Sequence, residues 1–460
     1  MQSVLDARPD ATSAPTRRVA VVGGGASGVL TAINLLAPAD PNLRVTLYES
    51  AADLGAGVAY GTTDARHLLN VRARHMSAFP DVPSDLIDWA ESNNRPVDRT
   101  AFLPRRDYAC YLRDRLGQVA DRRLQVVRAR VEDVVPSPGG FEVHAEGSVS
   151  ATADAVVLAY GNQAPRPLAV DAGELPLDAP WHVTNPWHLG WVETLSDDAT
   201  VVLVGTGLTA IDTAITVLDA QPGRQVIMTS RSGMLPRAHI DQQSTAWVSP
   251  VPSGELTADQ LAAFFVEQVS AAARQGVNWR NVVDGLRGAT QSMWLRLPLA
   301  ERRRFLALHA REWEVRRHRM APEIAARVAD YRREGRLRVV PGGIRSVDPE
   351  RRRCRVLLTG DDRPVSADAV VNCTGPETDA SQTKDPLLQR LRERSLVAPD
   401  QLRLGLDCTS VGELLDPTRQ VVPGLFAVGP PRKGCLYEST AVPEIRAQAA
   451  QVASLLLTVG

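Results

Sequence analysis

The sequence predicts an α/β fold with two Rossmann-like domains and a helical insertion in the second domain. Two stretches predict this fold: RVAVVGGGASG, from Arg18, and TVVLVGTGLTA, from Thr200. In each, a short apolar run suited to a buried parallel strand ends in a glycine turn, and a helical pattern follows. The third observation is length, because 460 residues with 44% hydrophobic side chains can build about three domains of ~150 residues.

The first glycine turn fits the dinucleotide-binding pattern GxGxxG. Gly23 permits the tight turn, Gly25 lets a pyrophosphate approach the backbone, and Gly28 lets helix and strand pack closely. Ser27 lies in the same turn, where the first N–H groups of the helix face an anion. Glu49 ends the next strand, and its carboxylate can accept both hydroxyls of an adenosine ribose. These five residues predict a first dinucleotide site.

The second glycine turn, GTGLTA, fits GxGxxA and predicts a second dinucleotide site at Gly205, Gly207 and Thr209. The strand that follows its helix ends in Ser230-Arg231 instead of an acid. An acid would repel a 2′-phosphate, whereas a hydroxyl and an arginine would accept it. The second site therefore favours NADPH over NADH. The alternative interpretation is that Arg231 is an ordinary exposed arginine.

Two nucleotide folds without a metal or thiol centre predict a two-dinucleotide-binding-domain flavoprotein, with FAD at the first site and NADPH at the second. The FAD-binding domain is expected over residues 18–165 and, after the chain returns, over 376–460. The NADPH-binding domain is expected over 180–375 and contains an Arg- and Trp-rich helical block at 257–333. The apolar strand GLFAVGP, near the end of the chain, is expected to bring Gly429 to the ribityl and pyrophosphate part of the flavin.

Composition argues against several classes of partner. The 52 basic and 53 acidic residues leave a net charge of -1, which does not suit a nucleic-acid-binding protein. No run of 18 apolar residues occurs, so no transmembrane helix or membrane partner is expected. The five cysteines are widely spaced and predict neither a metal site nor a vicinal disulfide. A floppy N-terminal leader of about 17 residues without an apolar signal segment, and the cysteine usage, predict a cytoplasmic protein.

Four strings resemble those of a known family: VVGGGASG, GVAYGTTDARHLLNVRARHMSAFP, FLPRRDYACYL and WEVRRHRMAP. They are similar to strings of bacterial FAD/NAD(P)-binding proteins of the NAD-binding-9 type, over almost the whole chain. The resemblance implies that HLLNV-x-x-x-x-MSAFP (67–80) lines the flavin, with Asn70 and Met76 near its ring. Many such flavoproteins carry an acid at the end of the last FAD strand. Here Pro430 follows Gly429, so backbone and the final helix must hold the flavin tail.

One branch of this family resembles N-hydroxylating monooxygenases that convert L-aspartate to nitrosuccinate, and this resemblance implies the same activity for the chain. The flavin would carry the chemistry, since its reduced form and O₂ give a C4a-hydroperoxide, and no catalytic side chain is named. The substrate would be a small amino acid with two carboxylates. Its carboxylates need cationic anchors, and Arg287 and Arg317 of the helical block are the expected ones.

Other functions stay open at this stage. An FAD/NADPH oxidoreductase could pass electrons to a quinone or another small acceptor without oxygenation. A flavin-binding sensor or scaffold would have little use for the second nucleotide site. A disulfide reductase would need a redox cysteine pair beside the flavin, and the sequence spacing shows none. The oligomeric state is not indicated by the sequence.

Overall fold

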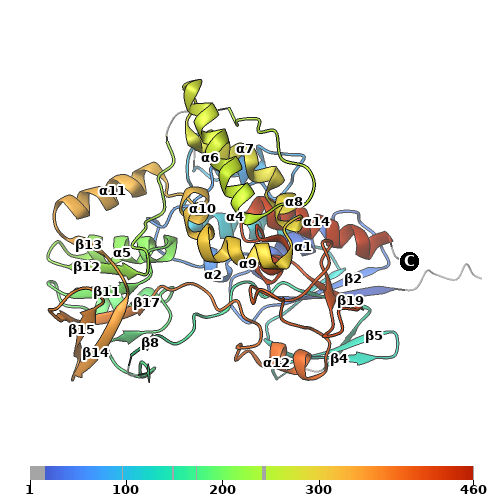
Figure 1. Ribbon diagram of the computed structural model, residues 1–460. Helices are drawn as coiled ribbons and strands as arrows, with labels where there is room; N and C mark the ends of the chain where they lie inside the picture. Colours follow the sequence, from blue (N-terminus) through green and yellow to red (C-terminus); the bar gives the residue numbers. More distant parts are fainter. Residues whose placement is uncertain (1–15, 96, 148–149, 172, 241–244, 459–460) are drawn as a thin grey trace, which may run out of the picture.

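The computed structural model describes residues 16–95, 97–147, 150–171, 173–240 and 245–458. Nearly all of the expected N-terminal leader lies outside these residues. Two separate parallel sheets form the core of two domains, which lie on opposite sides of the molecule in Figure 1. The predicted α/β fold with two Rossmann-like domains is confirmed.

The first sheet combines strands from both ends of the chain. Its order is β18 (Glu413–Leu415), β19 (Val421–Ala427), β7 (Ala155–Leu158), β1 (Arg17–Val22), β2 (Leu43–Tyr48) and β3 (Leu124–Val127). All neighbours are parallel except β18 and β19, which are antiparallel. Because β19 pairs with β7, the last quarter of the chain completes the sheet that the first strand begins.

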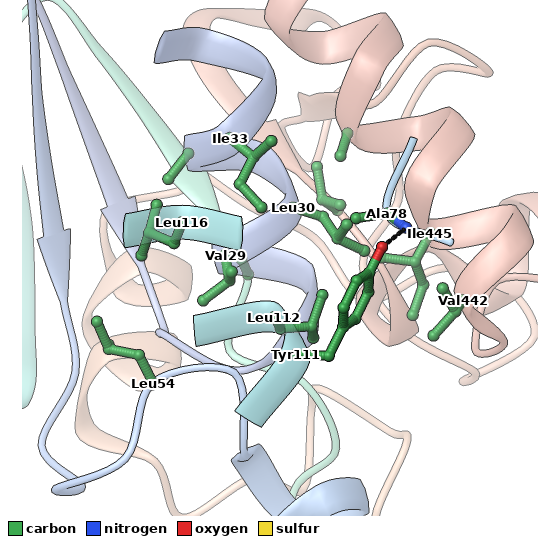
Figure 2. Close-up of a cluster of buried hydrophobic side chains, with 14 of the residues drawn as sticks. Val29, Leu30, Ile33, Leu54, Ala78, Tyr111, Leu112, Leu116, Val442 and Ile445 are labelled. Carbon is green, nitrogen blue, oxygen red and sulfur yellow. Dashed lines mark hydrogen bonds between the residues drawn. The ribbon is translucent and has the colours of Figure 1, made fainter. Parts of the chain in front are cut away.

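Alternating side chains of β1 face two different cores, as the two-residue period of a strand requires. Val19 and Val21 contact the core built by α1 (Ala26–Leu36), α4 (Arg105–Val119) and α14 (Val442–Thr458). Figure 2 shows side chains of these three helices meeting in this core, where Tyr111 Oη accepts a hydrogen bond from the N–H of Ala78. Ala20 and Val22 face the opposite core.

The opposite core lies under shorter elements of the first domain. They are β4 (Val131–Ser137), β5 (Gly140–Ala145), β6 (Ala151–Ala153) and α12 (Pro386–Glu393). Between the first sheet strands the chain also forms α2 (Gly57–Tyr60), the 3₁₀ turn Ala73–His75 and α3 (Asp85–Ser92). α2 and the 3₁₀ turn lie in the segment that the sequence leaves without periodicity.

The second sheet is parallel throughout, with the order β10 (His182–Val183), β17 (Ala369–Asn372), β11 (Thr200–Val204), β12 (Gln225–Ser230) and β13 (Leu337–Pro341). One face packs on α5 (Leu208–Ala220) and α11 (Pro322–Arg333). The other face packs on the three-stranded sheet of β14 (Ile344–Glu350), β15 (Arg353–Leu358) and β16 (Val365–Ala367). Short strands β8 (Ala169–Val170) and β9 (Gly173–Glu174) and the 3₁₀ turn Leu189–Thr194 precede β11.

The helical block spans both domains at the top of the view in Figure 1. It consists of α6 (Ala258–Arg274), α7 (Trp279–Leu286), α8 (Thr290–Leu295), α9 (Leu299–Leu308) and α10 (Ala310–Arg317), with a 3₁₀ turn at Arg287–Ala289. α6 begins at a capping box, in which Thr257 and Gln260 satisfy each other's backbone N–H groups. The block has its own apolar core, to which Tyr437 contributes from the end of the short helix α13 (Lys433–Leu436). No helix in the described part of the chain is long and apolar enough to cross a membrane.

Candidate functional site

The first glycine turn is held so tightly that two of its glycines are required by packing alone. Gly23 has a φ of +103°, and a Cβ there would lie 2.5 Å from the carbonyl oxygen of Ala159. A Cβ on Gly28 would lie 1.7 Å from the carbonyl oxygen of Gly23. Gly23 and Gly28 therefore fix the strand-to-helix turn, as the sequence pattern predicts.

The N-terminus of α1 is free to receive an anion. Gly25 is the N-cap residue, and within the described residues no side chain caps the helix and no acid lies in its first turn. Glu49 ends β2 beside this turn, where its carboxylate accepts hydrogen bonds from the N–H groups of Gly24 and Ala51, each at 2.8 Å. Free helix N–H groups suit a pyrophosphate, and the neighbouring carboxylate suits a ribose. These residues fit the FAD site that the sequence predicts.

Gly429 brings the returning chain against the first turn. Its φ of +88° favours glycine, and a Cβ there would lie 2.3 Å from Ser27 Oγ. Its N–H donates to Gln448 Oε1 of α14 at 2.9 Å. Ser27 is itself buried. The structure thus places Ser27 and Gly429 in contact, and the close approach explains why a small residue is needed at each position.

The second glycine turn repeats this arrangement with more open space. Gly205 has a φ of +133°, and a Cβ there would lie 2.1 Å from the carbonyl oxygen of Cys373. Gly207 is the N-cap residue of α5, and no described atom lies within 4 Å of the position its Cβ would take. Thr209, in the first turn of α5, lines the large cavity described below. The α5 N-terminus can therefore accept a second pyrophosphate.

Two arginines lie near the end of β12. The sequence predicts Arg231 at this site, but it does not predict Arg311. Arg231 is exposed, next to Ser230, whose hydroxyl forms a 2.8 Å hydrogen bond with that of Thr206 in the glycine turn. Arg311 reaches the same place from α10 and donates through Nη2 to Thr206 Oγ1 at 3.0 Å. Burial, and the nearby charge of Arg231, lower the pKa of Arg311. Two arginines and two hydroxyls therefore lie at the end of β12, beside the second glycine turn.

A cavity of about 540 Å³ lies between the two nucleotide-binding domains. Gly57 lines it from the first domain and touches the first glycine turn, since its Cα lies 3.4 Å from the Cβ position of Gly25. Leu208 and Thr209 line it from the α5 N-terminus. Further lining residues come from the strand end after β7, from the helical block and from the returning chain; they include Tyr160, Asn162, His318, Lys433 and Thr440. The cavity therefore reaches the first turn of α5 and, at Gly57, comes next to the first glycine turn.

Residues 64–67, at the start of the segment 67–80 and just before it, join the two domains. His67 lies in the cavity wall, and its Nε2 is 2.8 Å from Thr216 Oγ1 of α5. Asp64 Oδ2 accepts from the same hydroxyl at 2.7 Å, and Arg66 forms a 3.0 Å ion pair with Asp219. We call His67, Asp64 and Arg66, with their partners on α5, the interdomain latch. The sequence does not predict these contacts between the domains.

Asn70 and Met76, both expected near the flavin ring, lie in different surroundings. Asn70 lines the cavity, and its carbonyl oxygen is 3.1 Å from Nε2 of the half-buried His239. Met76 is 2% exposed and packs in the core shared by α1, α4 and α14, and it is not part of the cavity wall. Its position in the core gives it a packing role in the loop that supports the cavity.

The two arginines expected to anchor a substrate are paired with glutamates of this chain. Arg287 contacts both carboxylate oxygens of Glu444, at 2.6 and 2.8 Å. Arg317 is 7% exposed and lies 3.3 Å from Glu438 and 3.4 Å from Glu444. Neither arginine is part of the cavity wall, although His318, the residue after Arg317, is. These ion pairs fasten the helical block to the start of α14.

Two half-buried histidines near the cavity have lowered pKa values. Burial lowers the pKa of His318 to about 3, with a further contribution from the neighbouring positive charge of Arg317. Burial and the charge of Arg319 lower the pKa of His239 to about 3. Positive charge in the cavity wall therefore comes from Arg105 and Lys433, and Arg105 is already 3.2 Å from Asp212.

Comparison with known proteins agrees with the first glycine turn. The profile of a family described as FAD-NAD(P)-binding matches residues 20–163. Two curated fungal monooxygenases, from Penicillium ochrochloron and Penicillium crustosum, are each 28% identical over 227 residues, which are 47% of this chain. An uncharacterized Escherichia coli K12 protein is 22% identical over 260 residues. The aligned regions span only 35%, 36% and 47% of these three relatives, about half of their length or less.

Solved structures match over nearly the whole chain. An ornithine N-hydroxylase from Kutzneria sp. 744 has a TM-score of 0.64 at 16% identity and covers 96% of this chain and 99% of its own. L-lysine 6-monooxygenase from Pseudomonas syringae gives 0.61 at 17% identity, with the same coverages. Bacillithiol disulfide reductase from Staphylococcus aureus gives 0.59 at 12% identity, covering 97% of this chain and 100% of its own. The fold is that of two-dinucleotide-binding-domain flavoproteins. At these identities the likeness concerns the fold alone.

Proposed function

We propose that the protein is a flavin-dependent monooxygenase that binds FAD at the first glycine turn and NADPH at the second. One observation carries this proposal: the cavity between the domains is lined by the first turn of α5 on one side and by Gly57, which packs against the first glycine turn, on the other. A nicotinamide and a flavin held there can meet, which hydride transfer requires. Bound FAD, once reduced by NADPH, supplies the activation of O₂. The residues of the chain bind and orient both nucleotides and limit the access of water.

The thiols of the chain favour an oxygenase over a disulfide reductase. None of the five cysteines, all within the described residues, lines the cavity. Cys373 lies behind Gly205, where burial raises the pKa of its thiol to about 12, so it is not a thiolate. The fold does bring Cys408 and Cys435 together, which the spacing did not predict, and the interaction of the two thiols raises the pKa of Cys408 and lowers that of Cys435. This pair packs against the core beneath the first sheet, outside the cavity wall.

We further propose that the oxygen acceptor is the amino group of a small amino acid, with L-aspartate the first candidate. The curated relatives named as monooxygenases and the folds of ornithine and lysine hydroxylases support this class. Lys433 and Arg105 give the cavity wall positive groups that suit carboxylates. If Arg287 and Arg317 also anchor the substrate, its carboxylate has to replace Glu444, because that residue now occupies both arginines.

The test is a coupled assay across free amino acids. NADPH oxidation, O₂ uptake, hydrogen peroxide and hydroxylamine product are measured in parallel, first with aspartate and then with ornithine, lysine and neutral amino acids. We expect one of them to lower the peroxide yield and to give a stoichiometric N-hydroxylated product. If no amino acid gives product while a quinone accelerates NADPH oxidation, the oxygenase proposal fails and an electron-transferring oxidoreductase replaces it.

A further inference from the structure

The helical block contains a second cavity, of about 300 Å³, that shares no residue with the interdomain cavity. Helices α6, α8, α9 and α10 form its walls, together with the end of α13. Six aromatic side chains line it: Phe264, Phe265, Trp294, Phe305, Trp313 and Tyr437. Leu261, Met293 and Val266 add further apolar surface, and Val266 is 63% exposed, which shows where the cavity opens.

The rings are held in defined orientations instead of filling the space. Trp294 stacks on Tyr437 with centroids 4.7 Å apart and planes at 23°. Phe305 meets Tyr437 edge-on, at 5.6 Å and 89°. Trp294 Nε1 is fixed by the carbonyl oxygen of Gly434 at 3.0 Å. The walls therefore offer ring faces and edges in the orientations that aromatic partners prefer.

Tyr437 supplies one ring of the cavity wall. It is 6% exposed, and its hydroxyl is buried without a hydrogen-bond partner among the described residues. Because that hydroxyl is closed off from the open space, an occupant of the cavity meets the ring of Tyr437 and not its oxygen. The backbone φ of Tyr437 is +62°, which is rare for a bulky residue. Such strain persists where surrounding contacts enforce it. The strained backbone is what places the ring in the cavity wall.

We propose that this cavity binds a small neutral aromatic molecule of one or two fused rings. The apolar lining disfavours a charged ligand, because such walls offer few polar partners to an ion or to its water. At the rim, Glu312 and Arg316 form an ion pair with each other, so the entrance favours neither sign of charge. The volume lies at the lower end of the range for small-molecule sites. This site does not depend on the proposed function, since it shares no wall with the nucleotide cavity.

Binding of 2-naphthol to the purified full-length chain, measured by calorimetry, tests the proposal. Ala262 lines the cavity, so Ala262→Trp should fill it and weaken 2-naphthol binding at least tenfold. Its neighbour Ala263 is exposed on the same helix and is not part of the wall, so Ala263→Trp is the matched control. We expect the control to bind like the wild type. Equal binding by wild type, Ala262→Trp and Ala263→Trp, or no binding by wild type, would overturn the proposal.

Two further measurements keep the test decisive if Ala262→Trp does not fold. Tyr437→Phe keeps the ring and should leave 2-naphthol binding unchanged, whereas Tyr437→Gly removes the ring and should weaken 2-naphthol binding several-fold. A photoreactive naphthyl azide should label peptides of α6 and α8–α10, and excess 2-naphthol should suppress the label. Saturating NADP⁺ should leave the 2-naphthol Kd within about twofold. Labelling confined to peptides outside the helical block and the end of α13, or competition by NADP⁺, would show that the ligand binds elsewhere.

Discussion

Glycines of the same GxGxxG pattern differ in which atoms an added side chain would contact. At Gly28 a Cβ would overlap the backbone, which makes this glycine a requirement of the fold. At Gly25 a Cβ would meet only Gly57 Cα, at 3.4 Å, and the residue has an ordinary extended conformation. Gly25 is therefore the position where a side chain obstructs a bound pyrophosphate more than it obstructs folding.

Gly25→Val is expected to give a folded protein without FAD. The valine would occupy the position of the pyrophosphate, while the strand-to-helix turn stays intact. The measurement is the flavin-to-protein absorbance ratio of the purified variant, with circular dichroism to verify the fold. Gly117→Val, in open space on the exposed face of α4, is the control and should keep its flavin. A stoichiometrically yellow Gly25→Val protein would refute the assignment of the first site.

Nucleotide choice should depend on Arg231 and Arg311 together. A charge-assisted hydrogen bond contributes about 1.5–3 kcal/mol, so each alanine variant should raise the KM for NADPH by roughly tenfold or more. The KM for NADH should hardly change, because NADH has no 2′-phosphate. Steady-state kinetics with both nucleotides measures this, and Arg333→Ala, at an exposed position of α11, is the control. If the KM values for NADH and NADPH rise equally, the arginines only support the loop.

At the scale of elements, the sequence predicts helices and strands well where the pattern is local. The two strand-turn-helix units are recognisable because the apolar strand, the glycines and the helical pattern follow one another directly in the sequence. The interdomain latch and Arg311 were missed because their partners are distant in sequence: Asp64 meets Thr216, and Arg311 meets Thr206. Arginine-rich composition alone does not indicate which arginine reaches which site.

Asp64 should make the contact between the domains sensitive to acid. Burial alone would raise its pKa, but hydrogen bonds from Arg66 and Thr216 outweigh burial and hold the pKa well below its usual value. A carboxylate with a depressed folded pKa stabilises the protein above the unfolded pKa, near 4, and this contribution is lost as the pH falls further. Asp64→Asn should therefore lower the free energy of unfolding at pH 7 more than at pH 3.

Urea unfolding across this pH range measures the effect. Asp362→Asn, at an exposed loop position, is the control and should leave the pH dependence of stability unchanged. If Asp64→Asn shifts the unfolding midpoint equally at both pH values, the Asp64 charge does not stabilise the latch.

At the scale of the whole molecule, function depends on where the chain returns. The sequence indicates two nucleotide-binding domains. The pairing of β19 with β7 brings the last part of the chain back to the first of these domains. The sequence did not indicate that Arg287 and Arg317, the expected substrate anchors, form ion pairs with Glu438 and Glu444. Those contacts join the helical block to α14, and only the folded chain brings them together. The substrate is therefore less determined by the sequence than the cofactors are.

The central claim is that both nucleotides meet in the cavity between the domains. The most direct measurement mixes the purified, FAD-loaded protein with NADPH in the absence of oxygen and follows the absorbance of oxidised flavin. We predict rapid and complete bleaching, slower with NADH, and recovery of the absorbance when O₂ is admitted. A flavin that stays oxidised in the presence of saturating NADPH would contradict the account, because the two sites would then not share a path for hydride transfer.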